Sequence, residues 1–477
     1  MDTTIRTARR TWAVVALLCT AQAMLILDIT VVNVALPSIG EDLGMPVGDL
    51  QWVVTAYTLA FGGLIILGGR VGDVVGRRRA LLAGLVLFSA ASLAAALASS
   101  AGVLVAARAG QGVGAALIAP SALALVTMVV PDGGARHRAL AAWAAVAAGG
   151  GAVGVLLGGA LTAAFGWRAI FVINVPVGVT LAVGVLRTVP ALSALTRRRF
   201  DVVGALLATG SLVALTYGLT TAGATGWSSM QTRTLLGVAA VGLAAFVVTQ
   251  RVVREPLVPL TVFRRRSLVA ALVLMVLGMG PVFSGFFLSS LYLQQVLGHS
   301  ALRTGVEFLP IAVAIVAATH AGGRLVSRFG VRSVIATGLT VGAVGAVTLS
   351  QLTTESSYLV GVMPGFLLLG IGGGTAAAGV MIAALSGVDD EHAGIASGLA
   401  NTAHELAIAL TLPVLATVAA RSSGWASLGA EVDMDALTRG IADAFLAAAL
   451  IALAGAGVAA LLLRRTDVGT TPLHPVH

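Results

Sequence analysis

The sequence predicts an all-α polytopic membrane protein with fourteen transmembrane helices. Three observations support this prediction: the composition, the length of the apolar runs and the distribution of arginine. Hydrophobic residues make up 58% of the 477 residues and charged residues only 10%, whereas soluble domains carry about 25% charged residues. No soluble fold buries so much apolar surface. The composition therefore excludes a soluble enzyme, a disordered chain and a nucleic-acid-binding domain.

Fourteen apolar runs are long enough to cross a bilayer, which takes about 20 residues in a helix. In chain order they are 12–36, 51–69, 80–99, 102–130, 138–163, 168–188, 201–222, 234–250, 267–296, 304–323, 333–351, 358–386, 394–420 and 440–463. The short connections between them are rich in Gly, Pro, Ser, Asp and Arg, as turns are. None of the runs alternates with a period of two residues, which excludes a β-barrel.

Arginine predicts the orientation of these helices. All 29 basic residues are arginine, and cytoplasmic loops carry an excess of such residues. If the N-terminus is cytoplasmic, most arginines lie in inner loops, Arg108 lies inside a span, and the outer loops hold only Arg168, Arg233, Arg303, Arg421 and Arg439. Both termini are therefore predicted to be cytoplasmic. The net charge of +9 reflects this topology, in a bacterial cytoplasmic membrane, rather than a nucleic-acid partner.

A weak internal repeat predicts how the helices are grouped. The loop after the second run reads GRVGDVVGRRR (69–79), and the loop after the tenth run reads GRLVSRFGVR (323–332). Duplicated helical halves are common in secondary transporters, which bind substrate between the halves near the midplane. We therefore expect a six-helix half over 1–190, an inserted helix pair with its linkers over 191–266, and a second six-helix half over 267–477.

Five motifs, in order along nearly the whole chain, resemble a known family. They are LDITVVNVALP (27–37), the loop motif at 69–79, LVAARAGQGVGAA (104–116), WRAIFVINVPVG (167–178) and LYLQQVLGHSALRTG (291–305). They resemble the major facilitator superfamily and, within it, the fourteen-span drug:proton antiporters of the EmrB/QacA type. The resemblance implies the major facilitator fold, with six, two inserted and six helices. It also implies proton-driven drug efflux by alternating access.

The fifth run departs from the family pattern. It reads GGAVGVLLGG over 150–159, with Val155 where the family has a proline. Gly150, Gly154 and Gly158 still form a stripe on one helix face, which allows a close approach of another helix. Losing the proline removes an expected kink, and the effect of Val155 on coupling stays open.

Asp28 and Arg108 are ionisable residues inside predicted spans, where such groups are costly and by default functional. Asp28 lies nine residues before Pro37, taken as the outer edge, and Arg108 lies six residues into its run. At 1.5 Å per residue they lie about 13 and about 9 Å below that edge, so they can pair. We hypothesise that Asp28 exchanges a proton for substrate and that Arg108 favours its charged form. The alternative is a permanent ion pair that locks two helices.

Glu405 lies near the middle of the thirteenth run. Ser397, Asn401 and His404 fall on the same helix face. Glu405 is a candidate second proton site or counter-charge for a cationic substrate, and His404 is a candidate proton relay. The alternative is a polar patch that holds this helix against its neighbours. Glu307, by contrast, follows Arg303 by one turn near the outer edge, and we expect an interfacial ion pair there.

The loop motif and a set of cavity residues complete the candidate site. Glycines in the loop permit a tight turn, and the resemblance implies that the loop latches the two halves on the cytoplasmic side; anchoring by its arginines is the plain alternative. The loop residues are Gly69, Gly72, Asp73, Gly76 and Arg77. Aromatic rings near a carboxylate suit lipophilic cations, although such rings also pack or face lipid. The cavity candidates are Gln22, Asn33, Gln111, Phe283, Phe287, Gln294 and Asn401.

Enzyme signatures are absent from the sequence, which contains no Walker loop, nucleophile elbow or HExxH motif. We therefore expect no catalytic activity, no metal and no cofactor, with a proton gradient as the energy source. The expected partners are a lipophilic small molecule, whose cationic character stays open, together with protons and the lipid bilayer, without nucleic acid or an obligate protein. Three alternatives stay open: a dedicated exporter of one native metabolite or antibiotic, a solute importer, and a non-transporting membrane protein.

Overall fold

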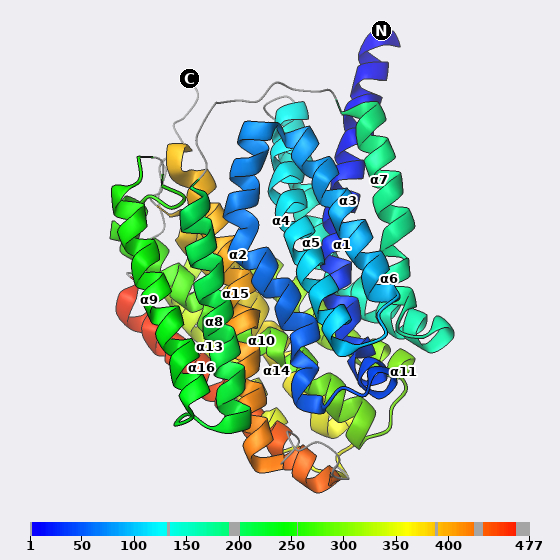
Figure 1. Cartoon of the computed structure of the whole chain (residues 1–477), viewed down its shortest axis with the longest axis vertical. Coiled ribbons are helices and arrows are strands. Elements are labelled where there is room, and N and C mark those ends of the chain that lie inside the picture. The colour runs from blue at the N-terminus through cyan, green and yellow to red at the C-terminus, as the bar shows by residue number, and fades with distance from the viewer. Residues whose placement is uncertain are drawn as a thin grey trace.

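The computed structural model describes residues 2–130, 134–189, 201–254, 256–386, 390–423 and 433–463, and it contains helices and no strand within these ranges. Figure 1 shows the helices running along one common direction. Their bounds are α1 (Asp2–Leu43), α2 (Gln51–Val75), α3 (Arg77–Ala96), α4 (Ala101–Val129), α5 (Gly134–Phe165), α6 (Ala169–Val172), α7 (Asn174–Thr188), α8 (Val202–Thr225), α9 (Met230–Val252), α10 (Arg266–Leu291), α11 (Ala301–Glu307), α12 (Leu309–Phe329), α13 (Val331–Leu349), α14 (Met363–Leu385), α15 (Asp390–Ser423) and α16 (Met434–Leu462).

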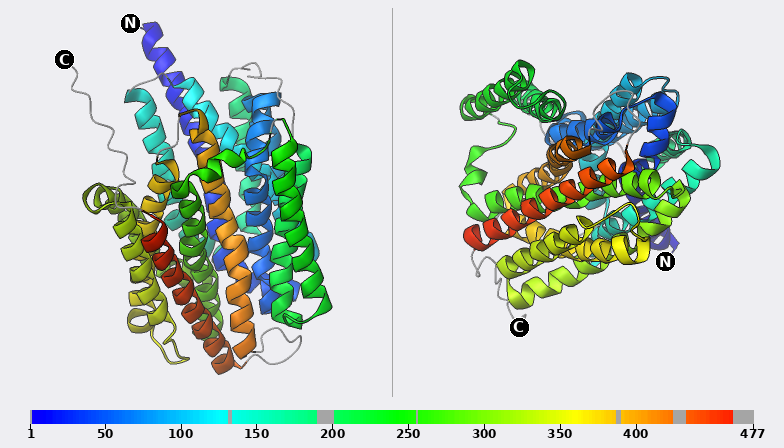
Figure 2. Two further views of the ribbon diagram at one scale, coloured as in Figure 1. Left: turned by 90° about the vertical axis from the view of Figure 1, so that its left-hand side faces the viewer. Right: turned by 90° about the horizontal axis from the view of Figure 1, so that it is seen from below.

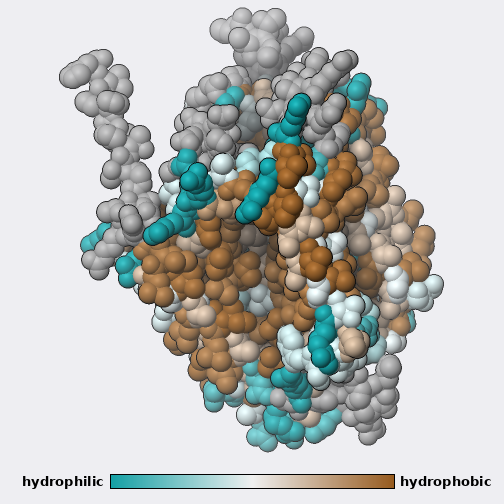
Figure 3. Space-filling view, turned by 60° about the vertical axis from the view of Figure 1, so that its left-hand side comes forward, coloured by the Kyte–Doolittle hydropathy of each residue, from teal (hydrophilic) through white to brown (hydrophobic). Residues whose placement is uncertain are grey.

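The chain is a multi-pass membrane protein. Among the described residues, 13 helices are long and apolar enough to cross a bilayer. The remaining expected span, 138–163, falls in α5, whose apolar described part is Gly149–Phe165, so the count of fourteen stays a prediction. A broad apolar band covers the face in Figure 3, with hydrophilic side chains gathered towards its two ends. Such a band matches a surface in contact with lipid rather than water.

The bundle has two ends, which we call upper and lower as drawn in Figure 1. The N-terminus of α1 and the turn between α2 and α3 lie at the upper end, and α11 lies at the lower end. The α16 helix rises towards the upper end in Figure 2. The arginine distribution predicts that the upper end faces the cytoplasm, and this orientation stays a prediction.

The two loops that predicted an internal repeat have the same backbone geometry. Gly76 ends α2 and precedes α3 with φ 101° and ψ 132°. Gly330 ends α12 and precedes α13 with φ 80° and ψ 154°. Glycine adopts a positive φ without the steric penalty that a Cβ brings. The tight turn expected at Gly76 is thus present in the structure, and the equivalence of the two loops stays a prediction.

Pro37, which the sequence interpretation took as the outer edge of the membrane, lies inside the first helix. The α1 helix contains Pro37 and continues to Leu43. A proline inside a helix lacks the N–H that would bond the carbonyl four residues earlier, which here is that of Asn33. Ser290 Oγ of α10 donates to this carbonyl at 2.6 Å. A residue of another helix thus satisfies the carbonyl that the proline leaves free.

The helices form two groups that meet along several contacts. In the first group, α1 packs against α4, α5 and α7, and α4 packs between α2 and α3. In the second group, α14 packs against α12 and α13, and α10 packs against α15 and α16. Between the groups, α2 packs against α15, α5 against α11 and α12, and α1 against α10. The predicted boundaries at 190 and 266 stay predictions, since residues 190–200 lie outside the described ranges.

The α8 and α9 helices form a pair at the edge of the bundle, as the view from below in Figure 2 shows. The α8 helix packs against both α2 and α15, so it lies over the line where the two groups meet. Thr209 Oγ1 donates to the Gly63 carbonyl of α2 at 3.2 Å. Thr417 Oγ1 of α15 donates to the Leu219 carbonyl at 3.4 Å.

The glycine stripe of α5 packs against α1, as the sequence predicted. A Cβ placed on Gly150 would lie 2.8 Å from Ile26 Cγ2, and one on Gly158 would lie 2.8 Å from the Val31 carbonyl oxygen. A Cβ on Gly154 would overlap Thr30. Only glycine therefore permits this approach. The α5 helix also runs through Val155 without interruption, as expected where the kink-forming proline is missing.

Candidate functional site

The Asp28–Arg108 pair joins α1 to α4 deep in the first helix group. Arg108 Nη1 lies 2.5 Å from Asp28 Oδ2, and both side chains are 1% exposed. Gln111 Nε2 donates to Asp28 Oδ1 at 3.0 Å, and Asn174 Nδ2 of α7 donates to the same oxygen at 2.7 Å. The Asp28 carboxylate thus accepts three hydrogen bonds. This full satisfaction stabilises a buried charge that would otherwise be expensive.

Arg108 is fixed by the same group of helices. Its Nε donates to the Val53 carbonyl of α2 at 2.8 Å, and Nη1 also donates to Gln111 Oε1 at 2.8 Å. The guanidinium carbon lies 4.5 Å from the centroid of the Tyr57 ring and 5.8 Å from that of Phe171. Aromatic faces attract such a cation. The described contacts of the pair therefore all lie in α1–α7.

Glu405 has different surroundings, at the contact of the two groups. The residue is 7% exposed, and Oε2 has no hydrogen-bond partner among the described residues. A Cβ placed on Gly62 of α2 would lie 2.7 Å from Glu405 Cβ and 3.5 Å from the Thr402 carbonyl oxygen. Only a glycine in α2 lets α15 bring Glu405 this close. Glu405 is thus a buried carboxyl group at the α2–α15 contact, with an oxygen that no described donor satisfies.

The residues of the predicted polar face of α15 contact two different helices, α2 and α10. The His404 ring lies edge-on to Phe283 of α10, with centroids 5.1 Å apart, whereas Glu405 faces α2. Asn401 is exposed, and the side chain of Ser397 lies outside the described residues. Because α15 packs between α2 and α10, one helix presents a carboxyl group to the first helix group and an imidazole to the second.

Other buried polar atoms also have no hydrogen-bond partner within the part of the chain that the structure describes. They include Gln22 Oε1 of α1, Tyr57 Oη of α2 and Thr402 Oγ1 of α15. Buried polar atoms are nearly always hydrogen-bonded in proteins. Because such unpaired polar atoms lie on helices of both groups, we infer that they bind water, a proton or a ligand. The sequence predicted Gln22 as a cavity residue, but it did not single out Tyr57 or Thr402.

Several predicted cavity residues form contacts between or within helices, and their role in a cavity stays a prediction. The Gln111 amide is hydrogen-bonded at both ends: Oε1 accepts from Arg108, and Nε2 donates to Asp28 and to Ser92. Phe287 is 1% exposed within the apolar core. Gln294 Nε2 donates to the Val34 carbonyl of α1 at 2.9 Å, so it joins the two groups near the lower end. These three side chains hold helices together in this structure.

Asn33, the remaining cavity candidate, uses its side chain within its own helix. Its Nδ2 donates to the Ile29 carbonyl at 3.2 Å. Its backbone carbonyl is the group that Ser290 satisfies. Asn33 therefore contributes through its backbone to the same α1–α10 contact near the lower end.

The side chains of the loop motif at 69–79 form contacts within the motif. Asp73 and Arg77 form an ion pair, and Arg77 Nη1 donates to the Gly69 carbonyl at 3.0 Å. A Cβ on Gly72 would lie 2.9 Å from Arg77 Cδ, so glycine makes room for the arginine. Gly76 supplies the positive φ of the turn. The loop's predicted role as a latch between the halves stays a hypothesis.

A cluster around Glu307 at the lower end includes the predicted Arg303–Glu307 pair, whose Nε–Oε1 distance is 3.0 Å. His299 Nδ1, in the connection before α11, also lies 2.7 Å from Glu307 Oε2, a contact that the sequence interpretation did not predict. Within the described ranges, no three His, Cys, Asp or Glu side chains gather in a way that could hold a metal ion.

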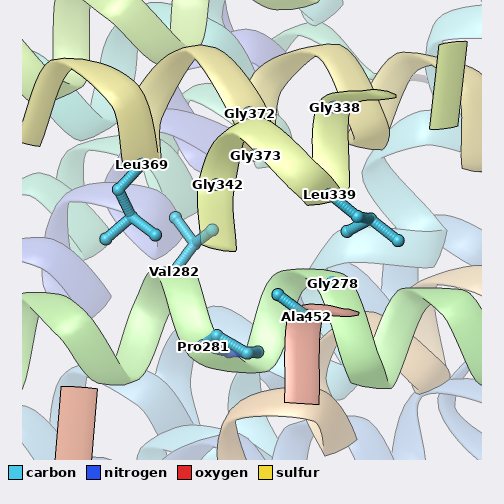
Figure 4. A pocket seen from close by; sticks show the side chains of 10 residues that line it. All are labelled: Gly278, Pro281, Val282, Gly338, Leu339, Gly342, Leu369, Gly372, Gly373 and Ala452. Atoms are coloured by element: carbon cyan, nitrogen blue, oxygen red, sulfur yellow. The ribbon is translucent and has the colours of Figure 1, made fainter. Parts of the chain in front are cut away.

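A small apolar void lies inside the second helix group, between α10, α13, α14 and α16 (Figure 4). Glycines of α13 and α14, with Pro281 and Val282 of α10, line it. Its lining carries no charged or hydrogen-bonding side chain. The polar chemistry of the bundle therefore lies elsewhere, around the Asp28–Arg108 pair and Glu405.

Comparison with known proteins identifies relatives over almost the whole chain. The family model of the Major Facilitator Superfamily matches residues 18–412. The cephamycin export protein of Amycolatopsis lactamdurans is 39% identical and covers 99% of this chain and 97% of its own length. The puromycin resistance protein of Streptomyces alboniger is 39% identical, over 86% of this chain and 82% of its own. A multidrug resistance protein of Mycobacterium tuberculosis is 35% identical, over 83% and 74%.

Solved structures share the fold at low sequence identity. A bacterial homologue of the human lysosomal transporter Spinster superposes with a TM-score of 0.67 at 16% identity, covering 95% of this chain and 97% of that one. A D-xylose–proton symporter gives 0.67 at 15% identity, covering 95% and 98%. These likenesses show the fold that the five motifs implied.

Proposed function

The chain belongs to the major facilitator superfamily, and from this premise we propose that it exports antibiotics or other lipophilic small molecules from the bacterial cytoplasm in exchange for protons. The proposal places it among the fourteen-span drug:proton antiporters. It involves no chemical reaction and no cofactor, because the proton gradient supplies the energy. The relatives named for export of, or resistance to, cephamycin, puromycin and several drugs support the direction of transport.

Glu405 is the observation that supports proton coupling best. An unsatisfied carboxyl group at the contact between two helix groups can respond to their movement, because separating α2 from α15 changes its exposure to water. Protonation removes the charge that burial disfavours. In this mechanism a proton from outside binds Glu405 and favours one arrangement of the halves, and its release to the cytoplasm favours the other.

Asp28 and Arg108 have a second role in the proposal. Their network is complete within the first helix group, so it holds α1, α2, α4 and α7 as one unit while the halves rock around a midplane cavity. Tyr57 lies against Arg108 and belongs to α2, which also carries Gly62 opposite Glu405. Asp28 remains the alternative proton site, with Arg108 as its ion-pair partner.

The test is gradient-driven dye transport. Inside-out vesicles with an imposed proton gradient should accumulate ethidium through the wild-type protein, and Glu405→Gln should abolish the gradient dependence while leaving the protein folded. Glu355→Gln makes the same chemical change at an exposed position and should transport like the wild type. If Glu405→Gln retains gradient-driven transport, Glu405 is not the coupling site. Loss in Asp28→Asn alone would then assign coupling to Asp28.

A dedicated exporter of one native antibiotic is the second candidate. The relative that covers 99% of this chain is named for export of a single antibiotic class, cephamycin. Competition separates the two candidates. Chemically unrelated compounds should inhibit dye transport by a multidrug exporter, whereas only structural analogues of the native compound should compete in a dedicated one.

A further inference from the structure

The segment between α9 and α10 is strongly basic. Residues 251–266 contain five arginines and one glutamate. Arg251 and Arg254 lie at the end of α9, and three consecutive arginines, 264–266, lie at the junction with α10. Figure 2 shows that the segment leads from the pair α8–α9 to the second helix group. An excess of arginine is expected in any cytoplasmic loop, so the surroundings of these arginines decide whether they form a site.

The backbone of this segment is packed against the bundle. Leu257, Val258 and Val262 are 4–5% exposed. They belong to an apolar cluster that also includes residues of α10, and Phe246 of α9 packs against this cluster. A 3-10 turn, Leu260–Arg264, leads into α10. The arginines at both ends of the segment are therefore carried by a backbone with a defined position.

The acidic residue next to this segment is already occupied. Asp201, at the start of α8, is 8% exposed and accepts from the Gly204 N–H at 2.7 Å, from Gln250 Nε2 at 2.5 Å and from the Leu257 N–H at 3.4 Å. Its described partners are thus amide groups rather than guanidinium groups. This carboxylate supports the backbone of the segment and leaves the arginines without a counter-charge from it.

Four of the five arginines are available to a ligand. Arg251, Arg254, Arg264 and Arg266 are exposed, and their side chains form no ion pair or hydrogen bond with the residues that the structure describes. By contrast, Arg168 at the lower end is paired with a carboxylate. A guanidinium group binds phosphate oxygens with two parallel hydrogen bonds. The four side chains therefore suit a phosphate group at the membrane surface.

The α9 helix provides an apolar surface beside these arginines. It packs mainly against α8, and only 11% of its membrane-crossing residues are buried by the protein, compared with 67% in α2. Val241, Val248 and Val252 are 71%, 58% and 78% exposed. Hydrocarbon chains of lipid must cover such a surface. A molecule with a phosphate headgroup and hydrocarbon chains matches both the arginines and α9.

We propose that Arg251, Arg254, Arg264 and Arg266 bind the headgroup of an anionic phospholipid whose acyl chains lie along α9. The bound lipid joins the end of α9 to the start of α10, and so helps to hold the α8–α9 pair to the second helix group. A zwitterionic lipid carries a phosphate but no net charge, and it should bind less tightly. The proposal does not depend on the substrate or the direction of transport.

The test measures lipid binding to the purified full-length protein. After the removal of bound lipid, the protein is titrated with phosphatidylglycerol or with phosphatidylcholine of the same acyl chains, and native mass spectrometry counts the bound lipids. Phosphatidylglycerol should bind more tightly to the wild type. Equal affinity for the two lipids would overturn the proposal.

Two double variants test the two ends of the segment separately, so that each removes only two charges from a folded protein. One combines Arg251→Gln with Arg254→Gln, and the other combines Arg264→Gln with Arg266→Gln. Each should weaken phosphatidylglycerol binding by about tenfold or more, because an arginine near an anionic headgroup contributes about fivefold. Phosphatidylcholine binding should change less. Unchanged phosphatidylglycerol affinity in both double variants would contradict the site.

The matched control combines Arg324→Gln with Arg328→Gln. These two arginines are also exposed, near the end of α12, and their loss should leave phosphatidylglycerol affinity unchanged. An equal loss in the control would show that the total charge of the protein, rather than this segment, attracts the lipid. Inorganic phosphate at the lipid concentration should not displace phosphatidylglycerol. Displacement would assign the arginines to a soluble phosphate and overturn the proposal.

Discussion

Asp28 and Glu405 are both buried carboxyl groups, but they differ in how completely they are satisfied. Asp28 accepts from an arginine and two amides, whereas Glu405 has an oxygen with no described donor. Their pattern in the sequence is similar: each is an acidic residue inside an apolar run. Depth alone predicted that Asp28 and Arg108 can pair. The amide of Asn174 could not be predicted, because its position depends on how α7 packs against α1.

The Asp28–Arg108 pair yields a prediction that separates its two interpretations. Arg108→Ala leaves the Asp28 charge buried without its cation, and breaking a buried pair costs about 3–5 kcal/mol. Asp28→Asn together with Arg108→Gln removes both charges, so this double variant should unfold at a higher temperature than Arg108→Ala. The unfolding temperatures of the two purified variants are compared by thermal unfolding, monitored through intrinsic fluorescence.

Transport by the same double variant then decides the role of the pair. A structural ion pair predicts gradient-driven transport close to that of the wild type, because Glu405 still carries the proton. A coupling role for Asp28 predicts a folded protein without gradient-driven transport. If the double variant is no more stable than Arg108→Ala, the unpaired buried charge of Asp28 is not what destabilises Arg108→Ala.

At the scale of helices, the sequence predicted a local turn better than a distant contact. A tight turn was expected in the loop at 69–79, and Gly76 has the positive φ that a side chain disfavours. Pro37 was taken as the outer edge of the membrane, and α1 continues for six residues beyond it. A glycine turn is a local property of the backbone. The residue that satisfies the Asn33 carbonyl, Ser290, is distant in the sequence, so this contact could not be predicted from the local pattern.

This interaction gives a prediction about α1 and α10. Ser290→Ala leaves the buried Asn33 carbonyl without a donor and should destabilise the protein by about 1–3 kcal/mol. Pro37→Ala restores the backbone N–H at position 37, which can bond the same carbonyl. In the Pro37→Ala background, Ser290→Ala should therefore have little effect on the unfolding temperature. Equal effects of Ser290→Ala in both backgrounds would contradict this pairing, as a double-mutant cycle shows directly.

At the scale of the whole molecule, the repeat predicted two halves but not what the inserted pair contacts. The α8 helix touches both groups: Thr209 donates to Gly63 of α2, and Thr417 of α15 donates to Leu219. Periodicity and composition predict that a segment spans the membrane, but they do not predict which helices lie next to it. The position of α8 between the two groups could therefore not be predicted. If the halves rock against each other, α8 must slide along one of them.

The upper end indicates which half α8 follows. Gln250 Nε2 and the Gly204 N–H both donate to Asp201, joining the end of α9 to the start of α8. The Val258 N–H donates to Gln250 Oε1 at 2.9 Å, which ties the linker to this corner. Val258 packs in an apolar cluster with Leu268 of α10. These contacts fasten the pair to the second half, so α8 should slide along α2.

A disulfide between α8 and α2 tests this movement. A Cβ placed on Gly63 would lie 3.6 Å from Thr209 Cβ, within the Cβ–Cβ range of about 3.5–4.5 Å that a disulfide requires. In a Cys19→Ala background, oxidised Gly63→Cys with Thr209→Cys should stop gradient-driven transport, and a reductant should restore it. Each single cysteine variant should be insensitive to oxidation. Full transport in the cross-linked protein would mean that α8 moves with α2 instead. The α8–α15 contact through Thr417 would then be the one that slides.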